Sequence, residues 1–193
     1  MKTLIIGGSK SGKSRFAEAL SLRLASGGKL VYFATMLPYD SEDRERIARH
    51  VAQREGKGFV TVECGRDILS APIPGEAPEE TTVLMDSLTA LFTNRMFARD
   101  YADEAASECA ARAKAELSSD VSAYASRVKH LVCVADEVTR GGYDFPASTR
   151  AWMEGFAGLI LRCAAEFDAV VEVTAGLARV RKGTLSGLGN IVF

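Results

Sequence analysis

The chain has 193 residues, of which 47% are hydrophobic and 25% are charged, and its formal net charge is -1. This composition is typical of a folded domain with a buried core, and the charge gives no indication of a nucleic-acid partner. The apolar run at the N-terminus stops at Ile6, too early for a signal peptide, and no other run reaches the roughly 18 residues of a membrane span. Four scattered cysteines without a C-x-x-C pair favour reduced thiols. We therefore expect one cytoplasmic domain over residues 1–193.

Apolar strands alternate with helices along the chain. The hydrophobic patterns predict strands at 3–7, 29–35, 58–64, 81–86 and 130–138, and a final strand at 168–176. Helices are predicted at 13–26, 42–54, 87–98, 101–127 and 147–165. This alternation predicts an α/β fold, a mainly parallel sheet with helices on both faces. Because ligands bind at the carboxyl ends of such strands, the polar residues after the first, second, fourth and fifth strands should meet at one edge.

Residues 7–14 read GGSKSGKS and fit the pattern G-x-x-x-x-G-K-[ST] between a predicted strand and a predicted helix. Glycines let backbone N–H groups approach a phosphate chain, and the helix N-terminus adds the positive end of its dipole. In this motif Lys13 reaches the β- and γ-phosphates and the Ser14 hydroxyl ligates Mg²⁺. The alternative is a chance glycine-rich turn. We predict a nucleotide site that consists of Gly7, Gly8, Ser9, Lys10, Ser11, Gly12, Lys13 and Ser14.

Asp86 ends the apolar run TVLMD of the fourth strand. An acid at this position is placed like the aspartate that holds Mg²⁺, directly or through water, in P-loop enzymes. Aspartate is also a favoured N-cap of a following helix, and the two interpretations are compatible. Asp86 is therefore predicted to lie at the metal.

The predicted helix 42–54 carries Arg46, His50 and Arg54 at i, i+4 and i+8, which puts them on one face. The plainer interpretation, which spacing alone favours, is a solvated basic face with an incidental histidine. The alternative is a nucleophilic His50 that attacks a phosphoryl group while the arginines bind its oxygens. Glu63, at the end of the third strand, could accept from a guanine edge or a ribose hydroxyl, or be an exposed strand end.

Together these segments resemble the bifunctional adenosylcobinamide kinase/adenosylcobinamide-phosphate guanylyltransferase family of cobalamin synthesis. The matching stretches follow the family's order: GGSKSGKSRFAEAL, VYFAT, ERIARHVAQR, FVTVEC, VLMDSLTALFTN, ADEV and VTAG. The P-loop alone is shared by many nucleotide-binding proteins. The form G-G-x-x-S-G-K-S-R-x-A-E followed by R-I-x-x-H-x-x-x-R is much more specific.

The resemblance implies a P-loop NTPase-like fold, a homotrimer, and an enzyme with two activities that uses Mg²⁺, with GTP and ATP as substrates. The first activity phosphorylates adenosylcobinamide. In the second, His50 attacks the α-phosphate of GTP, and the histidine–GMP intermediate passes GMP to adenosylcobinamide phosphate, giving adenosylcobinamide-GDP. Beyond the P-loop, the residues implied to bind nucleotide are Ala34, Thr35, Met36, Val51, Ala52, Gln53, Arg54, Glu63 and Asp86, and those implied at the metal are Ser14 and Asp86.

The chain departs from the family pattern between residues 136 and 162. Asp136 stands where an asparagine is expected, Pro146 is kept without the E-N that should follow, and GLILR at 158–162 replaces an R-x-N pattern. We expect these positions on the corrinoid side or at subunit contacts, and the tail 179–193 has no functional interpretation. Two other functions fit the sequence: a regulatory nucleotide-binding protein without catalysis, and a P-loop kinase of another small alcohol in which His50 is incidental.

Overall fold

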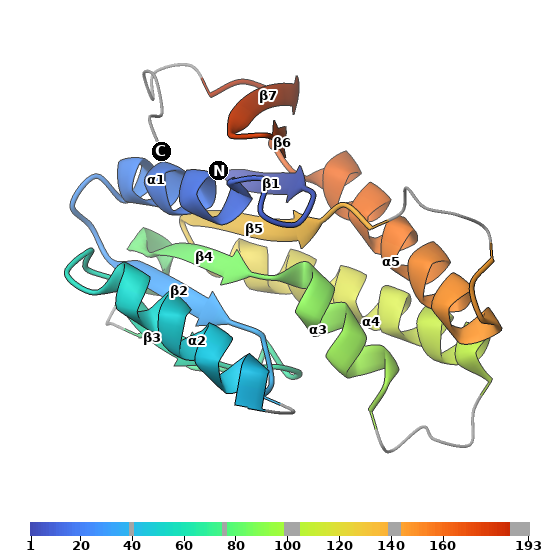
Figure 1. Ribbon diagram of the computed structural model, residues 1–193. Coiled ribbons are helices and arrows are strands. Elements are labelled where there is room, and N and C mark those ends of the chain that lie inside the picture. Colours follow the sequence, from blue (N-terminus) through green and yellow to red (C-terminus); the bar gives the residue numbers. More distant parts are fainter. Residues whose placement is uncertain (39–40, 75–76, 99–104, 139–143, 186–193) are drawn as a thin grey trace.

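A seven-stranded sheet in the order β3-β2-β4-β5-β1-β6-β7 forms the centre of the protein (Figure 1). The structure is a computed structural model that describes residues 1–38, 41–74, 77–98, 105–138 and 144–185, without the side chains of 42, 43, 46, 49, 50 and 53. Strands β1 to β6 are parallel, and β7 is antiparallel to β6. The mainly parallel sheet predicted from the sequence is confirmed. Its strands are β1 (Lys2–Gly7), β2 (Leu30–Ala34), β3 (Val60–Glu63), β4 (Thr82–Asp86), β5 (His130–Asp136), β6 (Ala169–Thr174) and β7 (Leu177–Lys182).

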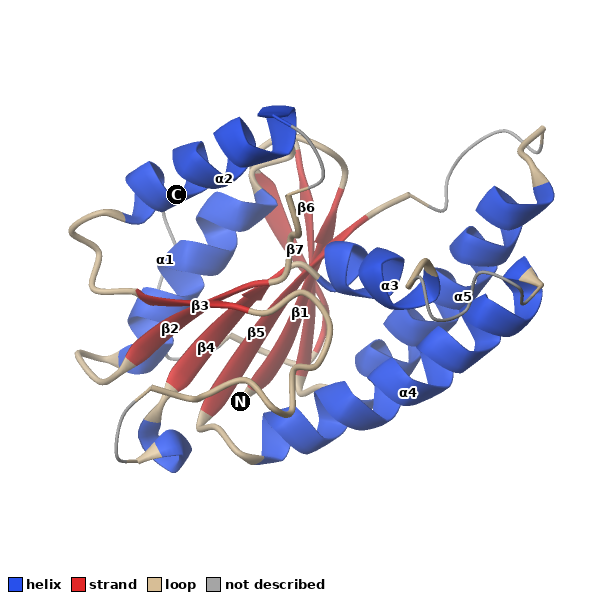
Figure 2. Ribbon diagram, turned by 90° about the horizontal axis from the view of Figure 1, so that it is seen from below, coloured by secondary structure: helices blue, strands red, loops and turns tan. Residues whose placement is uncertain are grey.

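Helices cover both faces of this sheet, as predicted. Figure 2 shows α1 and α2 on one side and α3, α4 and α5 on the other. Successive strand residues point to opposite faces, so Leu4 packs in the core under α3–α5, while Ile5 packs in the core under α1. The helices are α1 (Lys13–Ala25), α2 (Ser41–Arg54), α3 (Leu88–Met96), α4 (Ala106–Ser126) and α5 (Ala147–Glu166), with a 3-10 turn, η1, at Pro78–Glu80.

The sheet ends in a strand that the sequence analysis does not predict. The predicted final strand 168–176 is wrong at its C-terminal end, because Ala175 and Gly176 have positive φ values of 50° and 78° and reverse the chain after β6. β7 then pairs back along β6, and all of its residues are exposed. Its sequence LARVRK lacks the apolar face that would predict a strand. The tail therefore begins with an edge strand, and residues 186–193 lie outside the described part.

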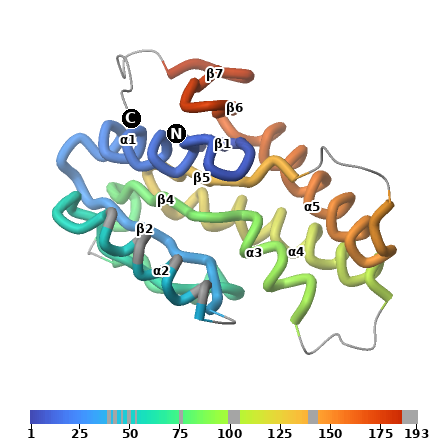
Figure 3. Tube along the Cα trace, in the orientation of Figure 1, coloured from blue at the N-terminus to red at the C-terminus, as the bar shows by residue number. Residues whose placement is uncertain are grey.

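Figure 3 traces α2 beside β2; in the sequence α2 lies between β2 and β3. The predicted helix 101–127 begins at Ala106 in the structure, and residues 101–104 are outside its described range. Across the described ranges, no helix has the length and apolar character needed to cross a membrane.

Candidate active site

The P-loop leaves β1 at Gly7 and enters α1 at Lys13, as the motif predicts. A Cβ on Gly7 would come within 2.5 Å of both the Ser11 hydroxyl and the Val173 carbonyl oxygen, so only glycine fits there. Gly12 has a φ of 95°, which glycine adopts without strain. It occupies the N-cap of α1 and has no side chain that could cap the helix. The first N–H groups of α1 therefore remain able to bind an anion.

Lys13 forms an ion pair with Asp136, whose Oδ1 lies 2.6 Å from the lysine Nζ. The same Nζ donates to the Gly8 carbonyl oxygen at 3.1 Å. Asp136 ends β5 opposite Gly7 of β1, and the Glu137 N–H donates to the Gly7 carbonyl oxygen at 2.9 Å. The structure therefore places the carboxylate of Asp136, one of the departures from the family pattern, at the P-loop lysine.

Asp86 ends β4 and accepts a hydrogen bond at 3.0 Å from the hydroxyl of Tyr32 in β2. Burial, followed by the negative charge of Asp86, raises the pKa of Tyr32 well above its usual value, so the phenol stays neutral and donates. The capping role considered for Asp86 falls to Ser87, which is the N-cap of α3 and accepts from the Ala90 N–H at 3.2 Å. The Asp86 side chain is therefore not the helix cap.

Arg54, the last residue of α2, stacks on the ring of Tyr32. Its Cζ lies 3.3 Å from the ring centroid, and the residue is only 5% exposed. The buried Nε and Nη1 have no hydrogen-bond partner among the described residues. A buried guanidinium with unused donors is suited to an anionic ligand with several oxygens.

Thr35 holds the loops of this edge together. Its hydroxyl donates to the Ser87 carbonyl oxygen and accepts from the Ser87 N–H, each at 2.7 Å. The buried Asn94 of α3 donates to the carbonyl oxygens of Thr35 at 2.8 Å and Gly65 at 2.9 Å. Thr35, which the family resemblance implies to bind nucleotide, is not among the residues that line the pocket described next, and its hydroxyl braces the Ser87 backbone.

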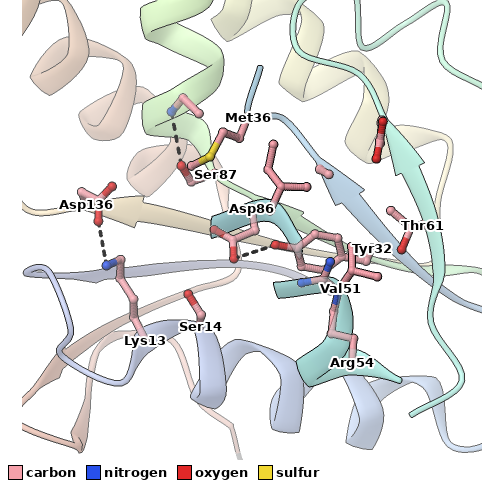
Figure 4. Close-up of a pocket in the computed structure, with 14 residues that line it drawn as sticks. Lys13, Ser14, Tyr32, Met36, Val51, Arg54, Thr61, Asp86, Ser87 and Asp136 are labelled. Atoms are coloured by element: carbon pink, nitrogen blue, oxygen red, sulfur yellow. Dashed lines mark hydrogen bonds and ion pairs between the residues drawn. The ribbon is translucent and has the colours of Figure 1, made fainter. Parts of the chain in front are cut away.

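One pocket gathers residues from the ends of β2, β3, β4 and β5, the start of α1 and the last turns of α2 (Figure 4). The predicted site residues that line it are Lys13, Ser14, Ala34, Met36, Val51, Arg54, Glu63 and Asp86. Ala52 lines an adjoining groove between α2 and β3 that shares Val51, Arg54 and Thr61 with the pocket. The side chains of Arg46, His50 and Gln53 are outside the described part of α2. The pocket residues that sequence analysis missed are Tyr32, Ile47, Thr61, Ser87, Ala90 and Asp136.

Chemically, the pocket offers cationic groups and hydroxyls for phosphates and hard oxygen ligands for a cation. The described residues contain no group of three or more His, Cys, Asp and Glu that could hold a metal alone. Ser14 and Asp86 supply one hydroxyl and one carboxylate, which fits Mg²⁺ because this ion keeps waters and shares substrate phosphates. Of the missed residues, Asp136 had a usable signal, because it is an acid at the carboxyl end of the fifth strand, at the predicted edge.

Known proteins resemble this chain in sequence and, more distantly, in structure. The bifunctional adenosylcobalamin biosynthesis protein CobP of Pseudomonas aeruginosa is 38% identical over 100 residues, covering 52% of this chain and 56% of CobP. The protein of the same description from Salmonella typhimurium, CobU, is 35% identical over 98 residues, covering 51% of each chain. The chain thus spans about half the length of the curated relatives it matches.

Among solved structures, the flagellar accessory protein FlaH from Methanocaldococcus jannaschii is 14% identical, with a TM-score of 0.44 over 95% of this chain and 79% of FlaH. Similarity at this level carries no functional information. The family described as cobinamide kinase / cobinamide phosphate guanyltransferase matches residues 3–180. The chain therefore belongs to the cobinamide kinase / cobinamide phosphate guanyltransferase family.

Proposed function

We propose that this protein phosphorylates adenosylcobinamide with ATP or GTP and then transfers GMP from GTP to adenosylcobinamide phosphate, giving adenosylcobinamide-GDP. Besides family membership, one observation carries the proposal: Lys13 of the P-loop, Asp86 of β4 and Arg54 of α2 line the same pocket. A triphosphate held by the P-loop would therefore lie within the cavity that the end of α2 borders. Each activity needs a phosphate of the nucleotide to face an attacking group there.

The nucleotide-binding role of the P-loop rests on its geometry. The uncapped start of α1 and Lys13 are suited to the β- and γ-phosphates, and the Ser14 hydroxyl and the Asp86 carboxylate are the groups that would hold Mg²⁺. Mg²⁺, when bound, neutralises charge on the phosphate oxygens. Glu63 and Met36 line the same pocket from β3 and the end of β2, where the nucleoside would lie.

The role of His50 rests on helix periodicity. Position 50 follows Ile47 by three residues and precedes Arg54 by four, and both of those residues line the pocket. Residues three and four apart share one face of a helix, which supports an imidazole directed at the nucleotide. A neutral imidazole nitrogen attacks the α-phosphorus of GTP, the bond to the bridging oxygen breaks and pyrophosphate leaves. A phosphate oxygen of the acceptor then attacks the same phosphorus, the P–N bond breaks and His50 is regenerated.

The guanylyl transfer is tested with GTP labelled at the α-phosphate. Protein incubated with this GTP and Mg²⁺ should acquire acid-labile label, and His50→Ala should acquire none. The matched control is His130→Ala, because His130 is the other of the two histidines and lies at the opposite end of the sheet, where β5 begins. Label that is absent from the wild-type protein, or that persists in His50→Ala, would exclude the histidine mechanism.

The kinase activity is tested separately with ATP or GTP labelled at the γ-phosphate and adenosylcobinamide as the acceptor. Label should move to the corrinoid in the wild-type protein and in His50→Ala, and Lys13→Ala should abolish the transfer. Label on the protein from α-labelled GTP without corrinoid phosphorylation would remove only the kinase half of the proposal. Failure of both reactions would favour the regulatory nucleotide-binding protein.

We also propose that the protein assembles as a homotrimer in the cytoplasm. The trimer is carried over from the resemblance to the family. Four cysteines without a disulfide suit a reducing compartment, which supports the proposed location. Light scattering coupled to size-exclusion chromatography should give three times the mass of 20.7 kDa, and a monomer or dimer would contradict the trimer.

A further inference from the structure

Tyr32 contacts two charged residues with different expected roles: Asp86 at the metal and Arg54 at the nucleotide. Its hydroxyl donates to the Oδ2 of Asp86 at 3.0 Å, and the Arg54 Cζ lies 3.3 Å from its ring centroid. Figure 4 shows Asp86 at the hydroxyl of Tyr32 and Arg54 beside its ring. Tyr32 and Arg54 are both almost fully buried, at 4% and 5% exposed.

The stack with Tyr32 fixes the plane of the Arg54 guanidinium. A guanidinium on an aromatic face keeps its N–H donors in its own plane, pointing past the ring edge. The Nε and Nη1 of Arg54 are buried without a hydrogen-bond partner in the described ranges, although unused buried donors are costly. Ring stacking compensates only part of this cost. Arg54 is therefore held in an orientation that an incoming anion can use.

The hydroxyl of Tyr32, at the far end of the ring, donates to Asp86. A neutral donor to one carboxylate oxygen fixes the rotamer of the carboxylate and directs how it meets a cation. The Tyr32 hydroxyl is this donor, and it lies 3.0 Å from the Oδ2 of Asp86. The same side chain thereby restrains an expected metal ligand and an expected phosphate ligand.

We propose that Tyr32 is a positioning residue that couples Mg²⁺ binding to GTP binding, by orienting Asp86 through its hydroxyl and Arg54 through its ring. This inference rests on the proposed GTP-dependent function. It assigns no contact between Tyr32 and the nucleotide. The two halves of the coupling are separable, because Tyr32→Phe removes the hydroxyl and keeps the ring, while Tyr32→Leu removes both.

The test measures GTP affinity by calorimetry in EDTA and across a series of Mg²⁺ concentrations. In Tyr32→Phe, the Mg²⁺ concentration that half-maximally strengthens GTP binding should rise about 10-fold, the usual cost of losing a partner of a metal ligand. Its GTP affinity in EDTA should stay at the wild-type value. In Tyr32→Leu, the affinity in EDTA should also fall, by about 5-fold, because Arg54 loses its platform.

The matched control is Tyr124→Phe. Tyr124 is 0% exposed, packs in the core on the other face of the sheet, and its hydroxyl has no hydrogen-bond partner among the described residues. The same substitution there should leave both affinities unchanged. Tyr32→Phe keeps the shape of the buried ring. If thermal denaturation shows that Tyr32→Leu is poorly folded, Tyr32→Phe alone still tests the positioning role.

Two results would overturn the inference, and they are distinguishable. If the wild-type protein binds GTP but Tyr32→Phe has its Mg²⁺ dependence unchanged, the positioning role is wrong and the proposed function stands. If the wild-type protein binds no GTP with or without Mg²⁺, the proposed function fails and the role of Tyr32 fails with it.

Discussion

The P-loop lysine Lys13 is paired with Asp136, the carboxylate that ends the neighbouring strand, at 2.6 Å. Both side chains are partly shielded, at 11% and 28% exposed. Lys13 is the group expected to meet the β- and γ-phosphates, so a bound triphosphate must compete with the carboxylate for it. Asp136 also places a negative charge next to the negative phosphates. At this position the chain has an acid where an asparagine was expected from the family resemblance.

We predict that Asp136→Asn binds GTP more tightly than the wild-type protein, by about 5-fold, the equivalent of about 1 kcal/mol for a partly exposed charge pair. The amide keeps the shape of the side chain and removes the competing charge. Calorimetry at physiological ionic strength measures the effect. Asp144→Asn is the control, because it removes the same charge from an exposed residue that does not line the pocket. Unchanged or weaker GTP binding in Asp136→Asn would show that the ion pair does not oppose the ligand.

Replacing Arg54 should weaken GTP binding without lowering the thermal stability of the unliganded protein. In Arg54→Met the two buried donors without partners disappear, which gains about 1–3 kcal/mol, while the lost stack on Tyr32 costs about 0.5–2 kcal/mol. The unliganded variant should therefore unfold at the same temperature as the wild-type protein or higher. Thermal denaturation with and without Mg²⁺–GTP checks both effects, because the stabilisation by GTP should shrink strongly. A large loss of stability without ligand would mean that Arg54 serves the fold.

Asn94 should be important to the fold of this edge. It is 3% exposed and donates to the carbonyl oxygens of Thr35 and Gly65, which follow β2 and β3. Asn94→Leu keeps the branched shape of the side chain but leaves both carbonyls without this donor, and we expect a loss of about 2–4 kcal/mol in the free energy of unfolding.

Urea denaturation measures the Asn94 effect, with Ser118→Ala as control. The Ser118 hydroxyl donates to a carbonyl oxygen of its own helix, at Lys114, so its loss should cost less than about 0.5 kcal/mol. Equal effects of the two substitutions would show that the Asn94 contacts do not hold the two loops.

Those parts of the fold and site that depend on local pattern were predictable. The apolar runs of β1, β4 and β5 and the P-loop motif carry their own signals, and so the sheet, its carboxyl edge and the positions of Lys13 and Asp86 follow from the sequence. β7 carries no such signal, because an exposed edge strand needs no apolar alternation. Its place is fixed by the tight turn at Ala175–Gly176 and by pairing with β6.

The contacts inside the site were not predictable in the same way. The stack of Arg54 on Tyr32 joins the end of α2 to the middle of β2, and no spacing rule relates residues 22 positions apart in two different elements. The Tyr32 position looked like any apolar strand residue, because its ring is buried in the core under α1. Asp136 was visible in the sequence, but its ion pair depends on the register in which Gly7 and Asp136 face each other.

Two glycines of α5 should respond in opposite ways to the same substitution. A Cβ on Gly158 would come within 2.7 Å of Lys114 Cδ, in a flexible side chain that can move aside. A Cβ on Gly155 would come within 2.8 Å of the Phe92 ring and 2.9 Å of the Ala110 Cβ, in a core where neither can move freely. Alanine favours a helix interior over glycine by about 1 kcal/mol, whereas overpacking costs about 1–3 kcal/mol.

Gly158→Ala should therefore raise the free energy of unfolding by about 0.5–1 kcal/mol, and Gly155→Ala should lower it by up to about 2 kcal/mol. Urea denaturation of the two variants beside the wild-type protein measures the difference, and each variant is the control for the other because helix propensity changes equally in both. The sign of the Gly155→Ala effect is decisive, since it depends only on how closely α5 approaches Ala110 of α4 and Phe92 of α3. If both substitutions raised the free energy of unfolding, α5 would have to lie farther from α3 and α4 than the Gly155 distances indicate.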